Sequence, residues 1–446
     1  MRYFYLILIS AIFFGGCTSY EPDSAEVVTT GDNLYLEFNK WVYKEINRQY
    51  LWREDLPDSS MCDFDLAPRD FFESLLSPKD RFSYFTTNKN YNPQRSSRSI
   101  GFAYQPVRDI NGNEAWEILY ITSPRLRSLG FRRGDLVRAI HESDGTYAIH
   151  KVRLQDNIMT VDTESYCLST SNSFESSTVL LDTVYQVEGR RVGYLCYLEY
   201  GDKSDLEQPL RRFSSEQITD LILDLRYNPG GYVSTCRFLC NCIVSETAYG
   251  KIFQQCTYND VLSAEYFDKT GDRKTYTYFE TPPQHIGENL GVLLTPLKLN
   301  RLYVITSSHT ASASEATIIC LRSYMPVTII GEQTVGKGVG SWTISSPQFR
   351  YALQPITMRY YNADGVSTPD RGLTPDVYVP DGYKTGKLEI GDTKETLLNV
   401  ALDCVMGQNH MPDDLCTLLK SETKLTPVGD PSYVTEFKNK HYNEIN

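Results

Sequence analysis

The pattern of apolar positions predicts that the chain begins with helices. After Asp32, apolar residues follow at positions 34, 38, 41, 42 and 46, the spacing of one face of a capped amphipathic helix. The run from Leu66 to Leu76 predicts a second helix, which Pro78 ends. We therefore expect an N-terminal helical segment over residues 31–95.

The pattern changes to β-like periodicity over residues 96–188. A strand is expected to begin at Ser99-Ile-Gly-Phe102, Asn111-Gly112 predicts a hairpin turn, and Trp116 to Ile121 alternates as a strand does. Residues 150–175 are polar and rich in Ser and Thr, which favours a surface insertion.

Longer apolar runs predict an α/β core over residues 189–384. The run Leu221 to Arg226 ends in Asn228-Pro-Gly-Gly231, which is typical of a buried strand entering a tight turn. The run Leu302 to Ile305 leads through Thr310-Ala-Ser-Ala-Ser-Glu315 into another apolar segment, which predicts a strand, a small-residue turn and a helix. For residues 385–446 we expect a helix from Leu388 to Leu402 and a loosely ordered tail. The fold class is α/β, in a multi-domain α+β chain.

Candidate chemistry lies at that turn. Ser312 is expected at a helix N-terminus, where unpaired N–H groups and the helix dipole favour the negative charge that develops in acyl transfer. Serine needs a nearby base, and Lys337 lies between glycines just after the apolar run Val327 to Ile330. Loss of solvation there would favour the neutral amine, so a Ser–Lys dyad is one hypothesis.

Simpler interpretations stand beside it. Ser312-x-x-Glu315 is also a capping box, and a lysine between glycines is usually a solvated loop residue. His309 is too close in sequence to be a typical base for Ser312, so we interpret it as a loop residue that shapes the pocket. Three cysteines, at 236, 240 and 242, have no further ligand at metal spacing and are expected to be buried thiols.

The order of three motifs carries a family resemblance. LDLRYNPGG, then TASASE, then GEQTVGKG resemble the C-terminal processing peptidases, also called tail-specific proteases. Ser77-Pro-Lys-Asp-Arg-Phe-Ser-Tyr84 and Gly372-Leu-Thr-Pro-Asp-Val377 extend the likeness from about Asn33 to the 400s. The resemblance implies a crotonase/ClpP-like peptidase core with an inserted PDZ-like β domain.

The resemblance also implies roles for residues. Ser312 would be the nucleophile and Lys337 the general base, with Glu315 ordering the pair. The amide of Ala313, with one from Gly230 or Gly231, would form the oxyanion hole. The family often has a glutamine four residues after the lysine to orient the amine. This chain has Ser341 there, which leaves the orientation of the lysine open.

The PDZ-like resemblance implies a peptide site. Ser99, Ile100, Gly101 and Phe102 stand where such domains carry the loop whose amides bind a peptide C-terminus while the peptide adds as a strand. The alternative is a PDZ-like spacer without a ligand.

The N-terminus predicts the compartment. Residues 1–16 have a positive start and an apolar stretch of about a dozen residues, and Gly15-Gly16-Cys17 resembles a bacterial lipoprotein signal. Cys17 would carry lipid, and residues 17–30 would tether the body to a membrane in the bacterial cell envelope. The alternative is an ordinary secretory signal.

Charge and composition narrow the partners. A net charge of −12 without a basic stripe argues against nucleic acid, and we expect neither a cofactor nor a metal. The predicted function is a serine-type endopeptidase that recognises proteins or peptides by a free C-terminal tail. The rival from another class is a catalytically inactive, peptide-binding envelope lipoprotein. Oligomeric state, natural substrate and disulfide pairing are left open.

Overall fold

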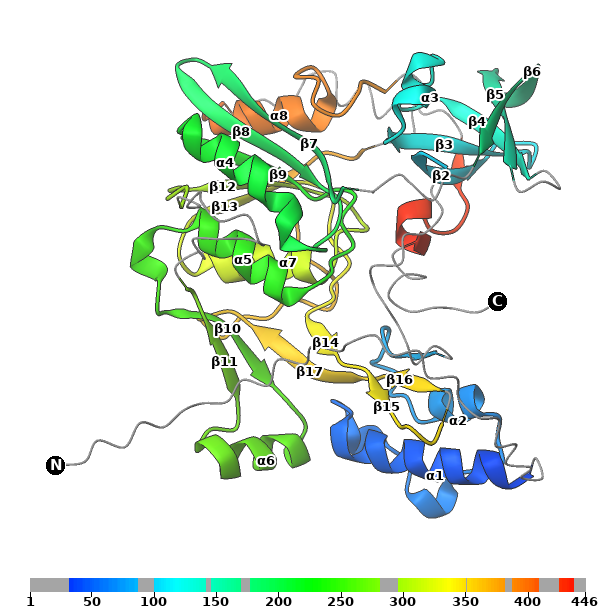
Figure 1. Ribbon diagram of the computed structural model, residues 1–446, viewed down its shortest axis with the longest axis vertical. Helices are drawn as coiled ribbons and strands as arrows, with labels where there is room; N and C mark the ends of the chain where they lie inside the picture. Colours follow the sequence, from blue (N-terminus) through cyan, green and yellow to red (C-terminus); the bar gives the residue numbers. More distant parts are fainter. Residues whose placement is uncertain are drawn as a thin grey trace, which may run out of the picture.

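The computed structural model describes eight stretches of the chain: residues 32–86, 100–141, 146–169, 177–280, 296–349, 351–381, 387–408 and 425–436. Cys17 and Ser99, for which the sequence predicts roles, lie outside these stretches. Figure 1 shows three regions: a helical region at one end, a central α/β body, and a β-rich unit beside that body.

The helical region forms as its apolar spacing predicts. Its elements are α1 (Asp32–Gln49), η1 (Arg53–Asp55), η2 (Ser59–Met61), α2 (Pro68–Ser74) and β1 (Tyr84–Thr86). Phe38, Val42 and Ile46 of α1 are buried. β1 pairs with β16 (Ala352–Gln354), which pairs with β15 (Ile344–Ser345). The N-terminal region is therefore joined to a hairpin from late in the sequence.

The β-rich unit is an antiparallel sheet with one short helix. Its elements are β2 (Phe102–Arg108), β3 (Glu114–Ile121), α3 (Pro124–Ser128), β4 (Leu136–His141), β5 (Thr146–Gln155) and β6 (Ile158–Ser169). The order is β19-β2-β3-β4-β5-β6, where β19 (Thr426–Pro427) comes from the C-terminal part of the chain. Residues predicted as a surface insertion instead form most of the β5–β6 hairpin, because Ser and Thr fit a strand that is exposed on one face.

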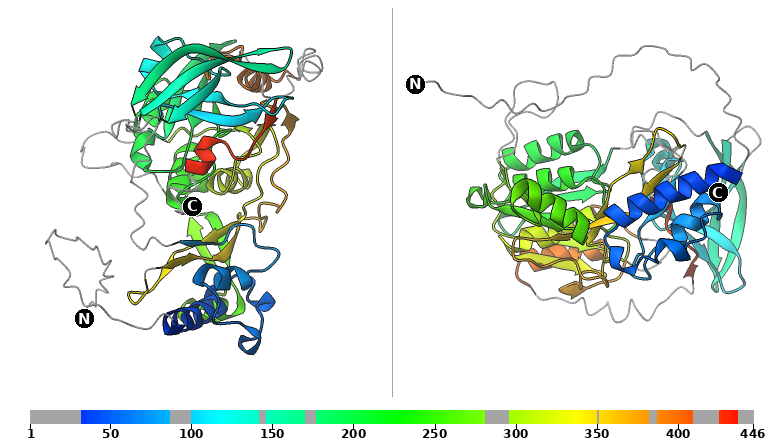
Figure 2. Two further views of the ribbon diagram at one scale, coloured as in Figure 1. Left: turned by 90° about the vertical axis from the view of Figure 1, so that its right-hand side faces the viewer. Right: turned by 90° about the horizontal axis from the view of Figure 1, so that it is seen from below.

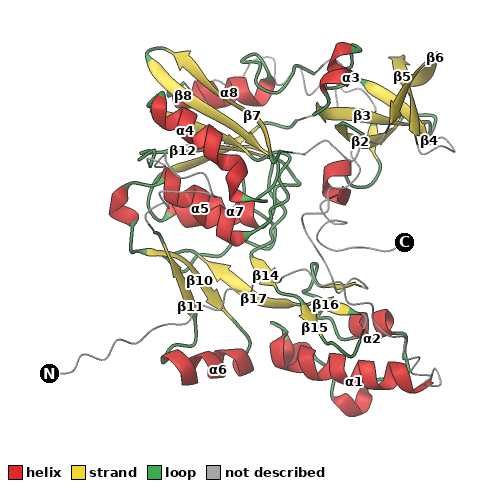
Figure 3. Ribbon diagram, viewed as in Figure 1, coloured by secondary structure: helices red, strands yellow, loops and turns green. Residues whose placement is uncertain are grey.

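The central body is a six-stranded sheet with helices on both faces. Its elements are β7 (Val179–Val187), β8 (Arg190–Tyr197), η3 (Lys203–Leu206), α4 (Glu207–Ser215), β9 (Asp220–Asp224), α5 (Val233–Ile243), η4 (Glu246–Ala248), β12 (Leu302–Thr306), α7 (Ala313–Arg322), β13 (Val327–Gly331), β18 (Val377–Tyr378) and α8 (Thr396–Val405). The strand order is β18-β13-β12-β9-β8-β7, and only the β7–β8 pair is antiparallel. Helices α4, α5 and α7 pack on one face and α8 on the other (Figures 1 and 3).

Two predicted boundaries are wrong. β7 pairs with β8, so it belongs to the central sheet, and a division at residue 188 assigns this strand to the wrong unit. α8 begins at Thr396 rather than near Leu388, because the Glu395 carboxylate caps the helix by accepting a hydrogen bond from the Leu398 amide.

A second, four-stranded sheet connects the body to the helical region. Its order is β11-β10-β17-β14, and it is formed by β10 (Ile252–Thr257), β11 (Thr275–Tyr278), β14 (Val339–Ser341) and β17 (Ile356–Tyr361). Helix α6 (Asp260–Thr270) packs near α1, and the left view of Figure 2 shows both at one end of the molecule. No helix in the described stretches is long and apolar enough to span a bilayer.

Candidate active site

Ser312 lies at the junction of β12 and α7, as the motif predicts. Its backbone has φ 58° and ψ −113°, a conformation that is costly for a residue with a side chain. Ser312 is partly exposed, while its neighbours Ala311 and Ala313 are buried. A strained residue that lifts one hydroxyl out of a buried turn is the geometry of a nucleophile held on a sharp strand-to-helix turn.

The Asn-Pro-Gly-Gly turn lies directly against this serine. A Cβ added to Gly230 would come within 2.8 Å of the Ser312 Cβ and 3.2 Å of the Ala313 nitrogen, so only glycine fits there. The Asn228 carbonyl accepts hydrogen bonds from the Ala311 amide (3.3 Å) and from the Ser314 hydroxyl (3.1 Å). The turn after β9 is therefore fixed to the turn before α7.

Glu315 connects the serine to the lysine loop. Its side chain is fully buried, and one oxygen, Oε2, accepts hydrogen bonds from both the Ser312 amide (2.9 Å) and the Lys337 amide (2.8 Å). The other oxygen, Oε1, accepts from the Gly336 amide (2.8 Å) and the Thr334 hydroxyl (2.5 Å). Burial raises the pKa of Glu315, and these four hydrogen bonds oppose that rise.

The amides predicted for an oxyanion hole are not equivalent. The Gly230 amide donates to the Asn228 side-chain oxygen (2.9 Å), so it is already used inside the turn. Gly231 has φ 132° and its backbone lies against Tyr200. Among the hydrogen bonds of the described residues, neither the Gly231 amide nor the Ala313 amide is a donor. Of the two glycines offered by the sequence, Gly231 is thus the better candidate.

Two residues from the helical region contact the lysine loop. The Arg81 guanidinium donates to the carbonyls of Val335 (3.0 Å) and Gly336 (3.4 Å), and the Lys337 amino nitrogen lies 5.3 Å from the centre of the Phe82 ring. Both belong to the Ser77–Tyr84 motif, for which the sequence suggested a family likeness but no role. Their contact with a loop more than 250 positions away could not be derived from local pattern.

Ser341, at the position of the usual glutamine, lies in β14 opposite Ile356 of β17. Its side chain is partly exposed. Among the described contacts no hydrogen bond joins the Ser341 side chain to Lys337, and the orienting role of Ser341 stays a prediction.

The other residues singled out from the sequence lie in three different parts of the structure. The His309 ring faces Tyr433, at a centroid distance of 6.2 Å, as part of the loop before Ser312. Cys236, Cys240 and Cys242 are buried in α5, and the described residues contain no cluster of His, Cys, Asp and Glu able to hold a metal ion. In the β-rich unit, Gly101 (φ 88°) has its carbonyl bonded to the amides of Thr122 and Ser123, and Phe102 is buried. Ile100 packs beside Phe102 in the core of this unit.

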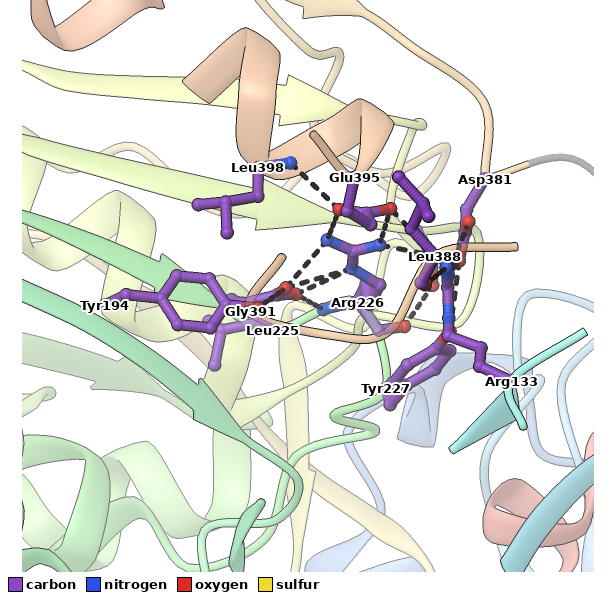
Figure 4. A network of polar contacts seen from close by, with 12 residues as sticks. Arg133, Tyr194, Leu225, Arg226, Tyr227, Asp381, Leu388, Gly391, Glu395 and Leu398 are labelled. Carbon is purple, nitrogen blue, oxygen red and sulfur yellow. Dashed lines mark hydrogen bonds and ion pairs between the residues drawn. The ribbon is translucent and has the colours of Figure 1, made fainter. Parts of the chain in front are cut away.

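A buried ionic network includes Arg226 and Tyr227, which directly precede the Asn-Pro-Gly-Gly turn (Figure 4). The Arg226 side chain is fully buried and binds the carboxylates of Asp224 (3.0 Å) and Glu395 (2.8 Å). Arg133, from the β-rich unit, binds Asp381 (2.8 Å) and the Tyr227 hydroxyl (3.1 Å). The network therefore joins the β-rich unit, the turn after β9 and the cap of α8.

The arginines of the network lower the pKa values of its carboxylates. Burial alone would raise the pKa of Asp381, but Arg133, Lys387 and Arg226 outweigh burial and hold it well below its usual value. Burial would also raise the pKa of Glu395, but the charge and hydrogen bonds of Arg226 outweigh burial and lower it. These carboxylates are thus ionised at neutral pH. Sequence spacing did not reveal the network, because its members come from distant parts of the chain: Arg133 and Asp381, for example, are 248 positions apart.

Comparison with known proteins agrees with this geometry. Residues 191–379 match Peptidase family S41, and residues 37–84 match the Peptidase S41 N-terminal domain. The chain is 30% identical over 223 residues to the carboxy-terminal-processing protease of Bartonella bacilliformis, a match that covers 47% of this chain but only 44% of that relative. It is 22% identical over 420 residues to the carboxy-terminal processing protease CtpA of Bacillus subtilis, covering 88% and 80% of the two chains.

A solved structure shows the same fold. A crystal structure of an S41 protease from Bacteroides fragilis NCTC 9343 matches with a TM-score of 0.66 and 22% identity, covering 87% of this chain and 99% of the other. The S41 matches fall in the family's order and include both the N-terminal region and the core that carries Ser312 and Lys337. The chain belongs to peptidase family S41.

Proposed function

We propose that this protein is a serine-type endopeptidase that cleaves proteins or peptides through an acyl-enzyme, with Ser312 as nucleophile and Lys337 as general base. One observation carries the proposal. A single oxygen of Glu315 accepts hydrogen bonds from the amides of both Ser312 and Lys337, so the two backbones are held within two hydrogen-bond lengths of each other. Family membership supports a peptidase, and the catalytically inactive alternative is not favoured.

The proposed chemistry follows from these groups. The neutral Lys337 amine takes the hydroxyl proton as the Ser312 oxygen attacks the substrate carbonyl. The negative charge that develops on the carbonyl oxygen is stabilised by the amides of Ala313 and Gly231. The lysine then gives the proton to the leaving amine, and the acyl-enzyme forms. Lys337 next deprotonates a water that attacks the ester, which frees the second product and restores Ser312.

The arrangement of Lys337 is the unusual part of this proposal. We infer that packing against Phe82 and the hydrogen bonds from Arg81 to the carbonyls of residues 335 and 336 help to orient the lysine. A general base must be neutral to accept the serine proton, so kcat/KM should rise with pH. A rate limb that disappears in His309→Ala would instead assign the base to histidine.

The β-rich unit is proposed to act as a PDZ-like module that selects substrates by a free C-terminus. The residues that would bind the carboxylate are Ser99, Ile100, Gly101 and Phe102. A β-branched residue at position 101 is not a clean test, because any Cβ there would meet the Ser123 Cβ at 2.6 Å. Amidating the C-terminus of a peptide substrate is a cleaner test: KM should rise while kcat changes little, and equal cleavage of both forms would leave the unit as a spacer.

The location is a further part of the proposal. The segment over residues 1–17 supports a lipoprotein anchored through Cys17 in the bacterial cell envelope. Mass spectrometry of the N-terminal peptide isolated from membranes tests this directly, since lipidation adds a defined mass at Cys17. An unmodified Cys17 would remove the anchor and leave the peptidase proposal intact.

The peptidase proposal is tested by incubating an unfolded protein, such as reduced casein, with the wild type and with Ser312→Ala. Mass spectrometry should find internal fragments only with the wild type. Equal fragments from both proteins would overturn the assignment of Ser312.

A further inference from the structure

The edge of β2 that does not pair with β3 is covered by a distant part of the same chain. Thr426 and Pro427 of β19 pair antiparallel with Arg108 and Val107, and the Val428 amide donates to the Pro106 carbonyl (2.8 Å). Side chains continue the contact, since the Ser432 hydroxyl accepts from the Tyr104 amide (2.9 Å). Figure 1 shows this segment in red beside β2. We call residues 425–436 the C-terminal strap.

The strap runs in a defined direction. Its residues contact β2 in descending order, from Arg108 at one end to Tyr104 near the other, so the strap advances toward Gly101. An extended peptide that adds to the β2 edge with its C-terminus toward the 100–102 loop would run the same way. Such a peptide would need the same backbone groups of Tyr104 and Pro106. Peptide and strap cannot occupy the edge together.

The strap also reaches the catalytic corner, by which we mean the turns at 228–231 and 311–313 together with the loop at 334–337. The Tyr433 ring is buried and lies 5.5 Å from the ring of Tyr227 and 6.2 Å from that of His309. Tyr227 directly precedes the Asn-Pro-Gly-Gly turn, and His309 precedes Ser312 by three residues. The strap thus touches both loops that carry the proposed oxyanion hole and nucleophile.

The backbone pairing of the strap with β2 is short. Its ladder with β2 has two residue pairs, whereas β2 and β3 share seven. Pro427 and Pro431 have no N–H to donate, and Gly429 turns the chain at φ 71°. A regular peptide without prolines would form a longer ladder on the same edge. The strap therefore makes defined contacts with β2, but its backbone ladder is only two residue pairs long.

We propose that the C-terminal strap is a resident occupant of a peptide-docking edge on β2, and that an extended substrate segment must displace it to reach the catalytic corner. The effect of the strap on catalysis rests on the proposed function. The competition between strap and peptide for the β2 edge does not depend on catalysis. The partner that fits the edge is an unfolded peptide that enters antiparallel to β2.

The test locks the strap in the full-length chain. Arg108 and Thr426 are exposed and directly opposite, so Arg108→Cys with Thr426→Cys allows a disulfide across the pair without removing a buried group. The Ser312→Ala background removes cleavage from the measurement. A fluorescent peptide with the sequence of residues 425–436, amidated at its C-terminus, reports binding by anisotropy.

The expected result is an affinity at least about tenfold lower in the oxidised protein than in the reduced protein, while each single-cysteine variant is insensitive to reductant. Equal affinity in both states overturns the competition. A second variant, Ser432→Ala with Tyr433→Ala, should bind the peptide more tightly than its parent, and the exposed Tyr278→Ala serves as its matched control.

Cleavage is then compared between the oxidised and reduced forms of the double-cysteine protein that keeps Ser312. Oxidation should slow casein cleavage by about the factor seen in binding, and reduction should restore it. If oxidation changes binding but not cleavage, the strap guards a docking edge that catalysis does not need. If no variant cleaves at all, the proposed function fails while the binding result still decides the strap.

Discussion

Two regions flank the loops of the catalytic corner, and they are built in opposite ways. Glu315 is buried among four hydrogen bonds that join the Ser312 and Lys337 loops, and Asn228 fixes a third loop to them. The C-terminal strap covers the β2 edge with a two-residue ladder interrupted by prolines. The loops of Ser312 and Lys337 are thus fixed in place, whereas the strap, on the proposal above, is a contact that an incoming peptide would exchange.

The largest effect is expected at the dyad. Ser312→Ala and Lys337→Ala should each reduce kcat/KM by about 10⁴-fold or more, and the double variant should be no worse than either single one, because the two residues act as a unit. Urea unfolding should be nearly unchanged, since both side chains are partly exposed. Substantial activity in Lys337→Ala would assign the base elsewhere, with His309 the next residue to examine.

Glu315 tests whether the corner is really fixed. Glu315→Ala leaves four donors without an acceptor, which should lower the free energy of unfolding by about 3 kcal/mol and kcat by a large factor. Glu315→Gln keeps the shape but has one accepting oxygen, so its effect should be intermediate. Thr334→Ala removes one of the four donors, together with the acceptor of the Leu373 amide, and should have a smaller effect than Glu315→Ala. A fully active Glu315→Ala enzyme would show that the loops hold without it.

The local structure around Ser312 and Glu315 could largely be predicted from the sequence, whereas the distant segments that pack around it could not. The turn at Ser312, the capping role of Glu315 and the glycines after β9 follow from short-range pattern, because a strand, a tight turn and a helix N-terminus each leave a local signature. The choice of Gly231 over Gly230 needed the Asn228 contact. The strap could not be predicted, since Thr426 and Arg108 are joined only by tertiary pairing between distant segments.

The buried ionic network that includes Arg226 should give a moderate effect on stability. Arg226→Met removes the cation that binds both Asp224 and Glu395 and leaves Glu395 only its longer ion pair with Arg133, which should cost about 3–5 kcal/mol in urea unfolding. Arg53→Met, which removes an ion pair with the exposed Asp260, is the control and should cost no more than about 1 kcal/mol. Similar losses in both variants would mean that burial does not set the strength of the network.

The same network predicts how stability changes with acid. The pKa values of Asp381 and Glu395 are lowered in the folded protein, so their contribution is complete above the ordinary carboxyl range near pH 4 and is lost as the pH falls through the lower folded values. Urea unfolding at pH 7, 5 and 3 should show a steep decline only in the last step. A decline already between pH 7 and 5 would have to come from other groups.

The smallest expected effect concerns the strap. Burial raises the pKa of Glu436 to about 7, and the phenols of Tyr104 and Tyr120 interact with its charge. A raised carboxyl pKa means that docking favours the protonated form, so docking is strongest in acid and weakens as the pH rises through 7. The hydrogen-exchange protection factor of the Val428 amide should therefore fall between pH 6 and 8, but not in Glu436→Gln. The Ile118 amide, which is buried in β3, is the internal control and should not respond. Equal protection of Val428 at both pH values would remove Glu436 from the control of the strap.

The proposed chemistry depends most on Ser312 being a nucleophile that Lys337 activates. Labelling with a fluorophosphonate, followed by peptide mass spectrometry, tests this without a known substrate, because only an activated serine reacts. We expect one adduct on Ser312 in the wild type, rapid enough to compete with hydrolysis of the probe, and none in Lys337→Ala. An adduct on another residue, or equal labelling of Ser312 in Lys337→Ala, would contradict the dyad.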